Sequence, residues 1–260
     1  MRRLITILAI MSISVCRLLS QNLVYQPGEK VSYLIQYGVL TGGKATLELF
    51  NDTYLNKPTY HARLTGYTSG LVDAVYKVRD VYECQLDPSN GLPLKSIRDI
   101  SEGKYKKKNI VTFDRETRAD SAILNSDLTG IHIKEKDIHD ILTCFYYFRN
   151  NILPQNESSM KIGDTFTINT WFTDEYFPIT LRYQGIEEIK TKAGKIKCHK
   201  FNPVCEIGRL FKSEDGLSIW FSADRNYLPV KIRFEIFVGA FEVDMYSYEG
   251  LKYPLEFKTK

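Results

Sequence analysis

The chain has 260 residues, a formal net charge of +4 and 43% hydrophobic residues, with seventeen tyrosines and fourteen phenylalanines. A charge so close to balance disfavours binding to nucleic acid, which depends on clustered Lys and Arg. The sequence contains no P-loop, dinucleotide fingerprint, HExxH or GxSxG pattern, so it identifies no reaction. Its length suits one large β domain or two small ones.

The amino terminus, MRRLITILAIMSISVCRLLSQ, has two arginines, an apolar stretch over residues 4–15, and then small and polar residues. This order is typical of a secretory signal peptide, and the apolar stretch is too short for a permanent membrane span. We expect residues 1–20 to be removed, so that the mature chain begins at Gln21. A lipoprotein signal with Cys16 as the lipidated residue is the second choice, because Val15 stands where a small residue is needed.

Removal of this peptide takes away Arg2, Arg3 and Arg17 and lowers the formal charge from +4 to +1. The lysine-rich run KYKKKN at residues 104–109 is typical of a hairpin or an exposed edge strand, where lysines discourage edge-to-edge pairing. No later segment resembles a membrane span. The sequence therefore predicts an exported protein of the periplasm, soluble or peripheral at the outer membrane, with no nucleic-acid partner.

Runs of β-branched and aromatic residues between turn signals predict strands in two sets. The first set lies at 30–37, 43–50, 59–65, 76–85, 94–99, 107–113 and 119–125, and the second at 165–171, 179–190, 196–202, 217–221, 229–237 and 241–248. We expect a mostly β protein of two similar antiparallel units, residues 21–135 and 152–260, forming a curved sheet or an open barrel. One continuous domain over residues 21–260 is the alternative.

The two sets share a hairpin pattern. LDPSNGLPLKSI at residues 86–97 and SADRNYLPVKI at residues 222–232 each contain Asp and Asn, then Leu-Pro, then an alternating apolar run. Asp and Asn favour a tight reversal, and Pro is tolerated at the first residue of a strand because its missing N–H is not needed there. The pattern indicates either an internal repeat or two hairpins with common turn chemistry.

One helix is expected over residues 136–151, between the two sets. Its apolar face has helical spacing and consists of Ile138, Ile141, Leu142, Phe145 and Phe148. Asp137 and Asp140 supply the cap and the first-turn charge, and Asn150-Asn151 with Pro154 ends the helix. We expect this helix to pack on the sheet.

Several segments together resemble the exported bacterial family catalogued as domain of unknown function 3108. They are GEKVSYLIQYGVLTGGKATLEL, VYKVRDVYECQLD, ISEGKYKKKNIVTFD, DIHDILTCFYYFR and IWFSADRNYLPVKI. The resemblance covers nearly the whole mature chain and implies a location in the cell envelope but no established activity. The signal peptide followed by Gln resembles those of Bacteroidetes. The hairpin pattern, a strand ending in Asp, a turn, then Leu-Pro and a second strand, more loosely resembles that of the outer-membrane lipoprotein carrier and receptor group. In that group a curved sheet surrounds a hydrophobic cavity.

Histidines and cysteines offer few candidates for chemistry. His132 and His139 could approach Asp137 or Asp140, but this spacing matches no standard metal motif and is also that of surface capping residues, so we expect no metal or other cofactor.

Loss of Cys16 leaves four cysteines for an oxidising compartment. Cys84 and Cys144 have the setting of buried thiols, and the candidate disulfide joins Cys198 to Cys205 across a turn at Asn202-Pro203.

Asp120-Ser121-Ala122 resembles the short O-glycosylation sequon of Bacteroidetes, which makes Ser121 a candidate modification site, although so short a motif also arises by chance.

The functional hypothesis follows from many aromatic residues and no catalytic motif. We expect a non-enzymatic protein that binds a lipid, an acyl chain or a lipidated envelope protein on a concave sheet. The candidate lining residues are Trp171, Phe177, Trp220 and Phe237. A filled aromatic core would use the same residues.

Two alternatives remain. One is a glycan-processing or other hydrolase with a carboxylate pair such as Asp80 with Glu83 or Asp99 with Glu102. The other is an assembly module without a small ligand. The sequence does not indicate the oligomeric state.

Overall fold

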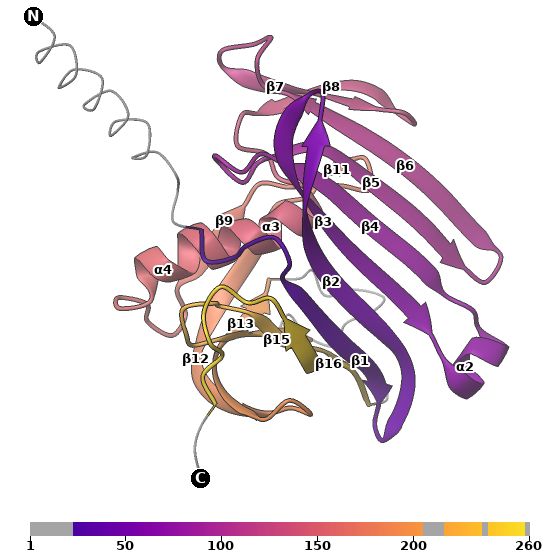
Figure 1. The fold of residues 1–260 in the computed structure, drawn as a ribbon, viewed down its shortest axis with the longest axis vertical. Coiled ribbons are helices and arrows are strands. Elements are labelled where there is room, and N and C mark those ends of the chain that lie inside the picture. The colour runs from indigo at the N-terminus through magenta and orange to yellow at the C-terminus, as the bar shows by residue number, and fades with distance from the viewer. Residues whose placement is uncertain (1–22, 205–215, 236–238, 258–260) are drawn as a thin grey trace, which may run out of the picture.

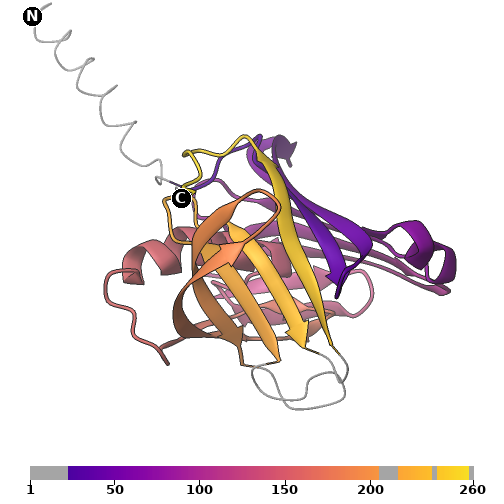
Figure 2. The same ribbon diagram turned by 90° about the horizontal axis from the view of Figure 1, so that it is seen from below.

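The computed structural model describes residues 23–204, 216–235 and 239–257. Its main feature is one antiparallel sheet of fourteen strands, in the order β8-β7-β6-β5-β4-β3-β2-β1-β16-β15-β14-β13-β12-β9 (Figure 1). Because β1 pairs with β16, the strands of the first and second halves extend from the middle of the sheet in opposite directions. The sheet is strongly curved but not closed, and β8 and β9 are its edges (Figure 2). The expectation of a mostly β protein with a curved sheet is confirmed.

The first half of the sheet contains β1 (Lys30–Tyr37), β2 (Leu40–Tyr54), β3 (Lys57–Thr68), β4 (Arg79–Leu86), β5 (Pro93–Glu102), β6 (Tyr105–Asp114), β7 (Ser121–Ser126) and β8 (Gly130–Glu135). The second half contains β9 (Thr165–Ile168), β12 (Ile179–Lys190), β13 (Lys195–Pro203), β14 (Leu217–Ser222), β15 (Pro229–Glu235) and β16 (Ala240–Glu249). The strands β10 (Trp171–Phe172) and β11 (Glu175–Tyr176) form a separate small hairpin. A helix α2 (Gly70–Val75), which the sequence pattern did not predict, connects β3 to β4.

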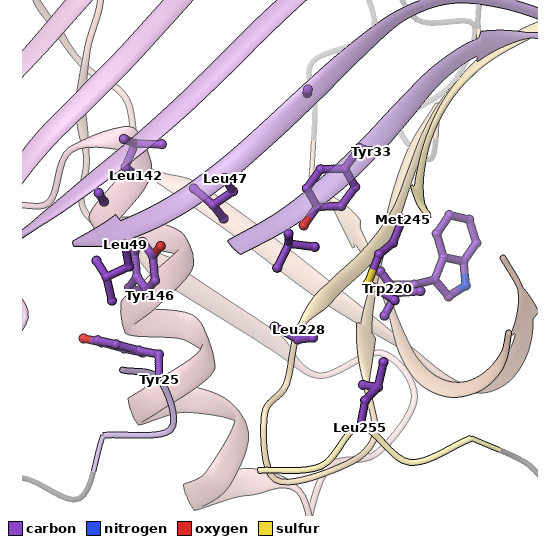
Figure 3. Packing of buried hydrophobic residues seen from close by; sticks show 14 of the residues in the cluster. Tyr25, Tyr33, Leu47, Leu49, Leu142, Tyr146, Trp220, Leu228, Met245 and Leu255 are labelled. Carbon is purple, nitrogen blue, oxygen red and sulfur yellow. The ribbon is translucent and has the colours of Figure 1, made fainter. Parts of the chain in front are cut away.

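Alternation of side chains explains which face of the sheet is covered. On β2, Ala45, Leu47 and Leu49 are buried, while the residues between them are partly exposed. Side chains two positions apart on a strand share a face. Leu142 and Tyr146 of the helix join Leu47 and Leu49 in one hydrophobic cluster, as Figure 3 shows. This face is therefore the inner face of the sheet, against which the helix packs.

The helix differs in extent from the predicted residues 136–151. It consists of α3 (Ile141–Tyr147), the π-helical turn η1 (Phe148–Ile152) and α4 (Leu153–Asn156). It starts later because Asp140 and Thr143 form a capping box, in which the Asp140 carboxylate accepts from the Thr143 N–H at 2.9 Å.

It also continues through Pro154, which was expected to end it. Pro154 has no N–H to donate, and the preceding turn widens so that the N–H of Leu153 reaches the carbonyl of Phe148. Ile138, predicted on the helix, is buried in the segment before it.

The two similar hairpins have the turn chemistry expected from their sequences. Asp87 accepts from the N–H of Ser89 at 2.8 Å, and Asp224 accepts from the N–H of Asn226 at 2.9 Å. Pro93 and Pro229 are the first residues of β5 and β15, and each hairpin has an irregularity beside its proline. The two hairpins thus reverse the chain by the same means.

Within the described residues, none of the helices is long and apolar enough to cross a membrane.

Candidate functional site

An apolar groove of about 290 Å³ lies on the inner face of the sheet, near the end of β1, β2 and β3 that adjoins α2. Its walls include Ile35, Tyr37, Gly43, Gly66, Val72 and Phe241. The volume is at the lower end of the range of about 300–1,000 Å³ that is usual for small-molecule sites. We call this feature the β1–β3 groove.

Small residues on neighbouring strands create this space. Ala45 pairs with Gly66 across β2 and β3, and Gly43 pairs with Ile35 across β1 and β2. Gly43 and Ala45 continue the alternation that buries Leu47 and Leu49, so the same inner face loses side-chain volume along β2. A Cβ at Gly66 would meet no atom within 4 Å. The missing side chain at Gly66 therefore leaves open volume, which a larger residue would fill.

The helix α2 forms the outer wall of the groove. Its Val72 lies against Gly42, where an added Cβ would meet the Val72 Cγ2 at 3.3 Å. The helix is held by Asp73, which accepts from Arg79 at 2.7 Å and from the Thr68 hydroxyl at 2.7 Å. These hydrogen bonds, that of Arg79 first, lower the pKa of Asp73 to about 2. The carboxylate is therefore charged at neutral pH and keeps α2 in place.

One polar pair borders the groove. Asp80 lines it and accepts from the Ser101 N–H at 3.0 Å. Burial, and then the adjacent Asp80 carboxylate, raises the pKa of Glu102.

The predicted lining residues do not share one site. Trp171 is buried, its ring centroid lies 4.6 Å from that of His132, and it borders a separate cavity of about 30 Å³ with Tyr82 and Arg98. The indole N–H of Trp171 has no hydrogen-bond partner. Phe177 is half exposed and lies 6.2 Å from Phe172 between ring centroids.

Trp220 is buried and belongs to the hydrophobic cluster that also contains Leu142 and Tyr146 of the helix (Figure 3). Its neighbours in the sheet, Lys200 and Lys231, pair directly with it and so share its face. The adjacent residue Ile219 points to the opposite face and belongs to the cluster with Phe148 of the helix. Trp220 and Ile219 thus take opposite faces of β14 and belong to different clusters, and the indole N–H of Trp220 donates to Glu187 at 3.0 Å. Phe237, the fourth predicted residue, lies outside the described residues.

The other candidate residues have the following positions. Cys84, Cys144 and Cys198 are buried, whereas Cys205 lies outside the described residues, so the Cys198–Cys205 disulfide stays a prediction. Ser121 is largely buried at the start of β7, where its hydroxyl accepts from Arg118 at 2.7 Å and contacts Asp120 at 2.9 Å.

The two histidines have separate partners. His132 contacts Thr129 at 2.8 Å, and His139 contacts Thr143 at 3.2 Å. Among the described residues, no group of three or more His, Cys, Asp or Glu side chains is arranged so that it could hold a metal ion.

Sequence reasoning missed the β1–β3 groove. The glycine and alanine positions in GGKATLEL and Gly66 were the available signal, but their convergence depends on the β2–β3 register.

A deeply buried ion pair was missed as well. Arg149 of the π-helical turn donates to Glu29 at 2.6 and 2.9 Å, and neither side chain is exposed by more than 1%. The pattern of apolar residues on the helix gave no sign that an arginine would be buried.

The fold defines a class: an open, barrel-like antiparallel β protein with a helix against its inner face. The family model described as "Protein of unknown function (DUF3108)" matches residues 32–246, so the chain belongs to this family. A comparison with curated proteins finds no match.

A solved structure shares the architecture. The chain is similar to a β-barrel-like protein of domain of unknown function DUF1849 from Brucella abortus, with a TM-score of 0.57 and 7% identity over 87% of this chain and 98% of that one. At such low identity the similarity concerns the fold alone. A DUF1089 family protein from Pseudomonas aeruginosa is also similar, at 10% identity over 75% of this chain and 92% of that one, with a TM-score of 0.39.

Proposed function

We propose that this protein is a non-enzymatic, exported protein of the cell envelope that binds an acyl chain, of a lipid or a lipidated protein, in the β1–β3 groove. The observation that carries the proposal is the open volume at Gly66, on the face of the sheet where β2 buries Ala45, Leu47 and Leu49. The amino-terminal sequence supports export.

The chemistry of the groove fits an apolar ligand better than a charged one. Ile35, Val72 and Phe241 supply apolar walls, and the Asp80 carboxylate at one side would repel an anionic head group. A chain segment that buries about 200 Å² of apolar surface would gain about 5 kcal/mol, at about 25 cal/mol per Å². The volume of about 290 Å³ suits one segment of a chain rather than a whole phospholipid. The head group would therefore stay outside.

Titration of the purified, delipidated protein with a fluorescent fatty acid tests the proposal. We expect saturable binding that persists in high salt, because salt screens ionic contacts but not apolar burial. Gly66→Leu should weaken binding at least tenfold, since the leucine occupies the open volume. Gly66→Ala is the matched control and should bind nearly as well as the unmodified protein, because one methyl group fills little of it.

Two results would reject the proposal. One is the absence of saturable binding in both low and high salt. The other is binding by a folded Gly66→Leu variant with unchanged affinity, which would place the ligand elsewhere. Circular dichroism and the thermal midpoint establish that each variant is folded.

A further inference from the structure

We propose that the end of the sheet around α2 docks on the surface of an anionic phospholipid bilayer. Three connections meet at this end: the β1–β2 turn, α2 with the residues after it, and the β5–β6 turn. They lie along the lower right edge of the sheet in Figure 1. Docking of this surface does not require an occupied groove.

Hydrogen bonds link α2 and the residues after it to the β5–β6 turn and to β2, just after the β1–β2 turn. The N–H of Ser69, just before α2, donates to the carbonyl of Gly42 at 2.9 Å. The N–H of Gly103 in the β5–β6 turn donates to the carbonyl of Lys77 at 2.8 Å. Tyr76 packs against the same turn, where a Cβ at Gly103 would lie 3.0 Å from its ring. The three connections therefore form one surface, which we call the α2 surface.

Large apolar side chains project from the α2 surface into solvent. Val39 is fully exposed, Val75 is 89% exposed and Leu71 is 80% exposed. Tyr76 and Tyr105 are half exposed beside them. Isolated exposed apolar residues are ordinary, but a group of them on adjoining turns marks an interaction surface. Aliphatic residues flanked by tyrosines are the composition that favours the interface between lipid head groups and acyl chains.

Charge identifies the partner as anionic lipid. Lys77, Lys104 and Lys106 are exposed on the α2 surface. The acids of the three connections are Asp73 and Glu102. Asp73 is paired with Arg79 at 2.7 Å, so the three lysines outnumber the one remaining acid, Glu102. Exposed lysines around apolar residues are attracted to the negative surface potential of anionic bilayers.

The location of the β1–β3 groove agrees with docking at this end. Val72 of α2 and Tyr37, beside the β1–β2 turn, both line the groove. A bilayer that contacts Leu71 and Val75 would therefore lie next to the groove. An acyl chain could then pass between bilayer and groove over a short path.

Flotation with vesicles tests the inference. We expect the protein to float with phosphatidylcholine vesicles that contain 30% phosphatidylglycerol, and at least tenfold less with pure phosphatidylcholine. Leu71→Ser with Val75→Ser should reduce the bound fraction at least fivefold. Leu55→Ser with Ile162→Ser is the matched control. Leu55 and Ile162 are apolar residues with similarly high exposure, 75% and 74%, but they lie outside the α2 surface. This control should float as the unmodified protein does.

Further variants separate charge from apolar contact. Lys77→Gln, Lys104→Gln and Lys106→Gln together should abolish the preference for phosphatidylglycerol, and raised salt should do the same. Gly66→Leu should keep vesicle docking while it loses fatty-acid binding, so failure of docking and failure of the groove are distinguishable.

Three outcomes would overturn the inference. The first is no flotation with anionic vesicles at low salt. The second is undiminished flotation of the folded Leu71→Ser and Val75→Ser variant. The third is a dimer in solution that this variant abolishes, without vesicle binding, which would assign the surface to a second copy of the chain.

Discussion

Arg149 and Glu29 form a two-point ion pair in the interior, with Nη1 donating to Oε1 at 2.6 Å and Nη2 to Oε2 at 2.9 Å. Arg149 also donates to the carbonyl of Asn226 at 3.0 Å from Nη2 and 3.2 Å from Nε. Burial opposes the charge, but the adjacent Glu29 carboxylate outweighs it and raises the pKa of Arg149. The pair joins the segment before β1, the helix and the β14–β15 turn.

Removal of one partner should therefore be strongly destabilising. Arg149→Met leaves the Glu29 carboxylate buried without its partner, and we expect the free energy of unfolding to fall by about 3–5 kcal/mol. Urea denaturation followed by circular dichroism measures this. The double variant Glu29→Gln with Arg149→Met should lose less, since no charge is then buried alone. A single variant that unfolds at the same urea concentration as the unmodified protein would contradict the prediction.

His139 should make stability depend on pH. Burial, and then the nearby Arg115 charge, lowers the pKa of His139 to about 3, against about 6.5 when unfolded. The unfolded chain therefore binds a proton in this range that the folded protein excludes, so the stabilising contribution is complete above pH 6.5 and decreases as the pH falls toward 3.

Urea titrations at several pH values, compared with those of His139→Gln, isolate this residue from the carboxylates. We expect the variant to have a shallower decrease of stability between pH 6.5 and pH 3. Equal slopes for the two proteins would show that His139 accepts a proton in the folded state.

The buried thiols should be unreactive in the folded protein. Burial raises the pKa of Cys84 and Cys144, and raises that of Cys198 to about 12, so little reactive thiolate is present at pH 8. Iodoacetamide followed by peptide mass spectrometry should modify these three residues only after denaturation. Modification of native Cys144 within minutes would disprove its burial.

Gly250 should not tolerate a side chain. Its φ of 64° lies in the left-handed region, and an added Cβ would overlap the backbone carbonyl of Gly28. Gly250→Ala should lower the free energy of unfolding by more than about 2 kcal/mol, because conformational strain and overlap act together. Gly130→Ala is the control: its φ of 80° brings strain, but no atom lies within 4 Å of the added Cβ. Similar losses at both sites would mean that the overlap is relieved.

The elements with a strong local pattern were predictable from the sequence. Residues 30–37 and 179–190 form strands with the predicted bounds, since β-branched and aromatic residues recur through both segments. The prolines at 93 and 229 start strands as expected. These features depend on neighbours in the chain, so residue type and turn chemistry are sufficient to find them.

Features that depend on distant contacts were not predictable. The groove requires Ala45 to face Gly66 on the next strand, and the burial of Arg149 requires Glu29 on another element. Trp171 and Trp220 were both predicted to line the ligand site because both are aromatic residues of the second set of strands. Without the strand register, a sequence does not reveal which face of the sheet each side chain takes.

The pairing of β1 with β16 has a consequence for how the protein assembles. Lys30 and Glu249 are partners although they lie near opposite ends of the described chain. Hairpins within each half need only short loops, whereas the pairing of β1 with β16 closes a very long loop. We therefore expect this pairing to form late and to slow folding. Before β16 pairs with it, β1 is an edge strand, and its unpaired N–H and C=O groups can pair with strands of other chains. A chain that stops short of β16 would keep that edge permanently and would aggregate rather than fold.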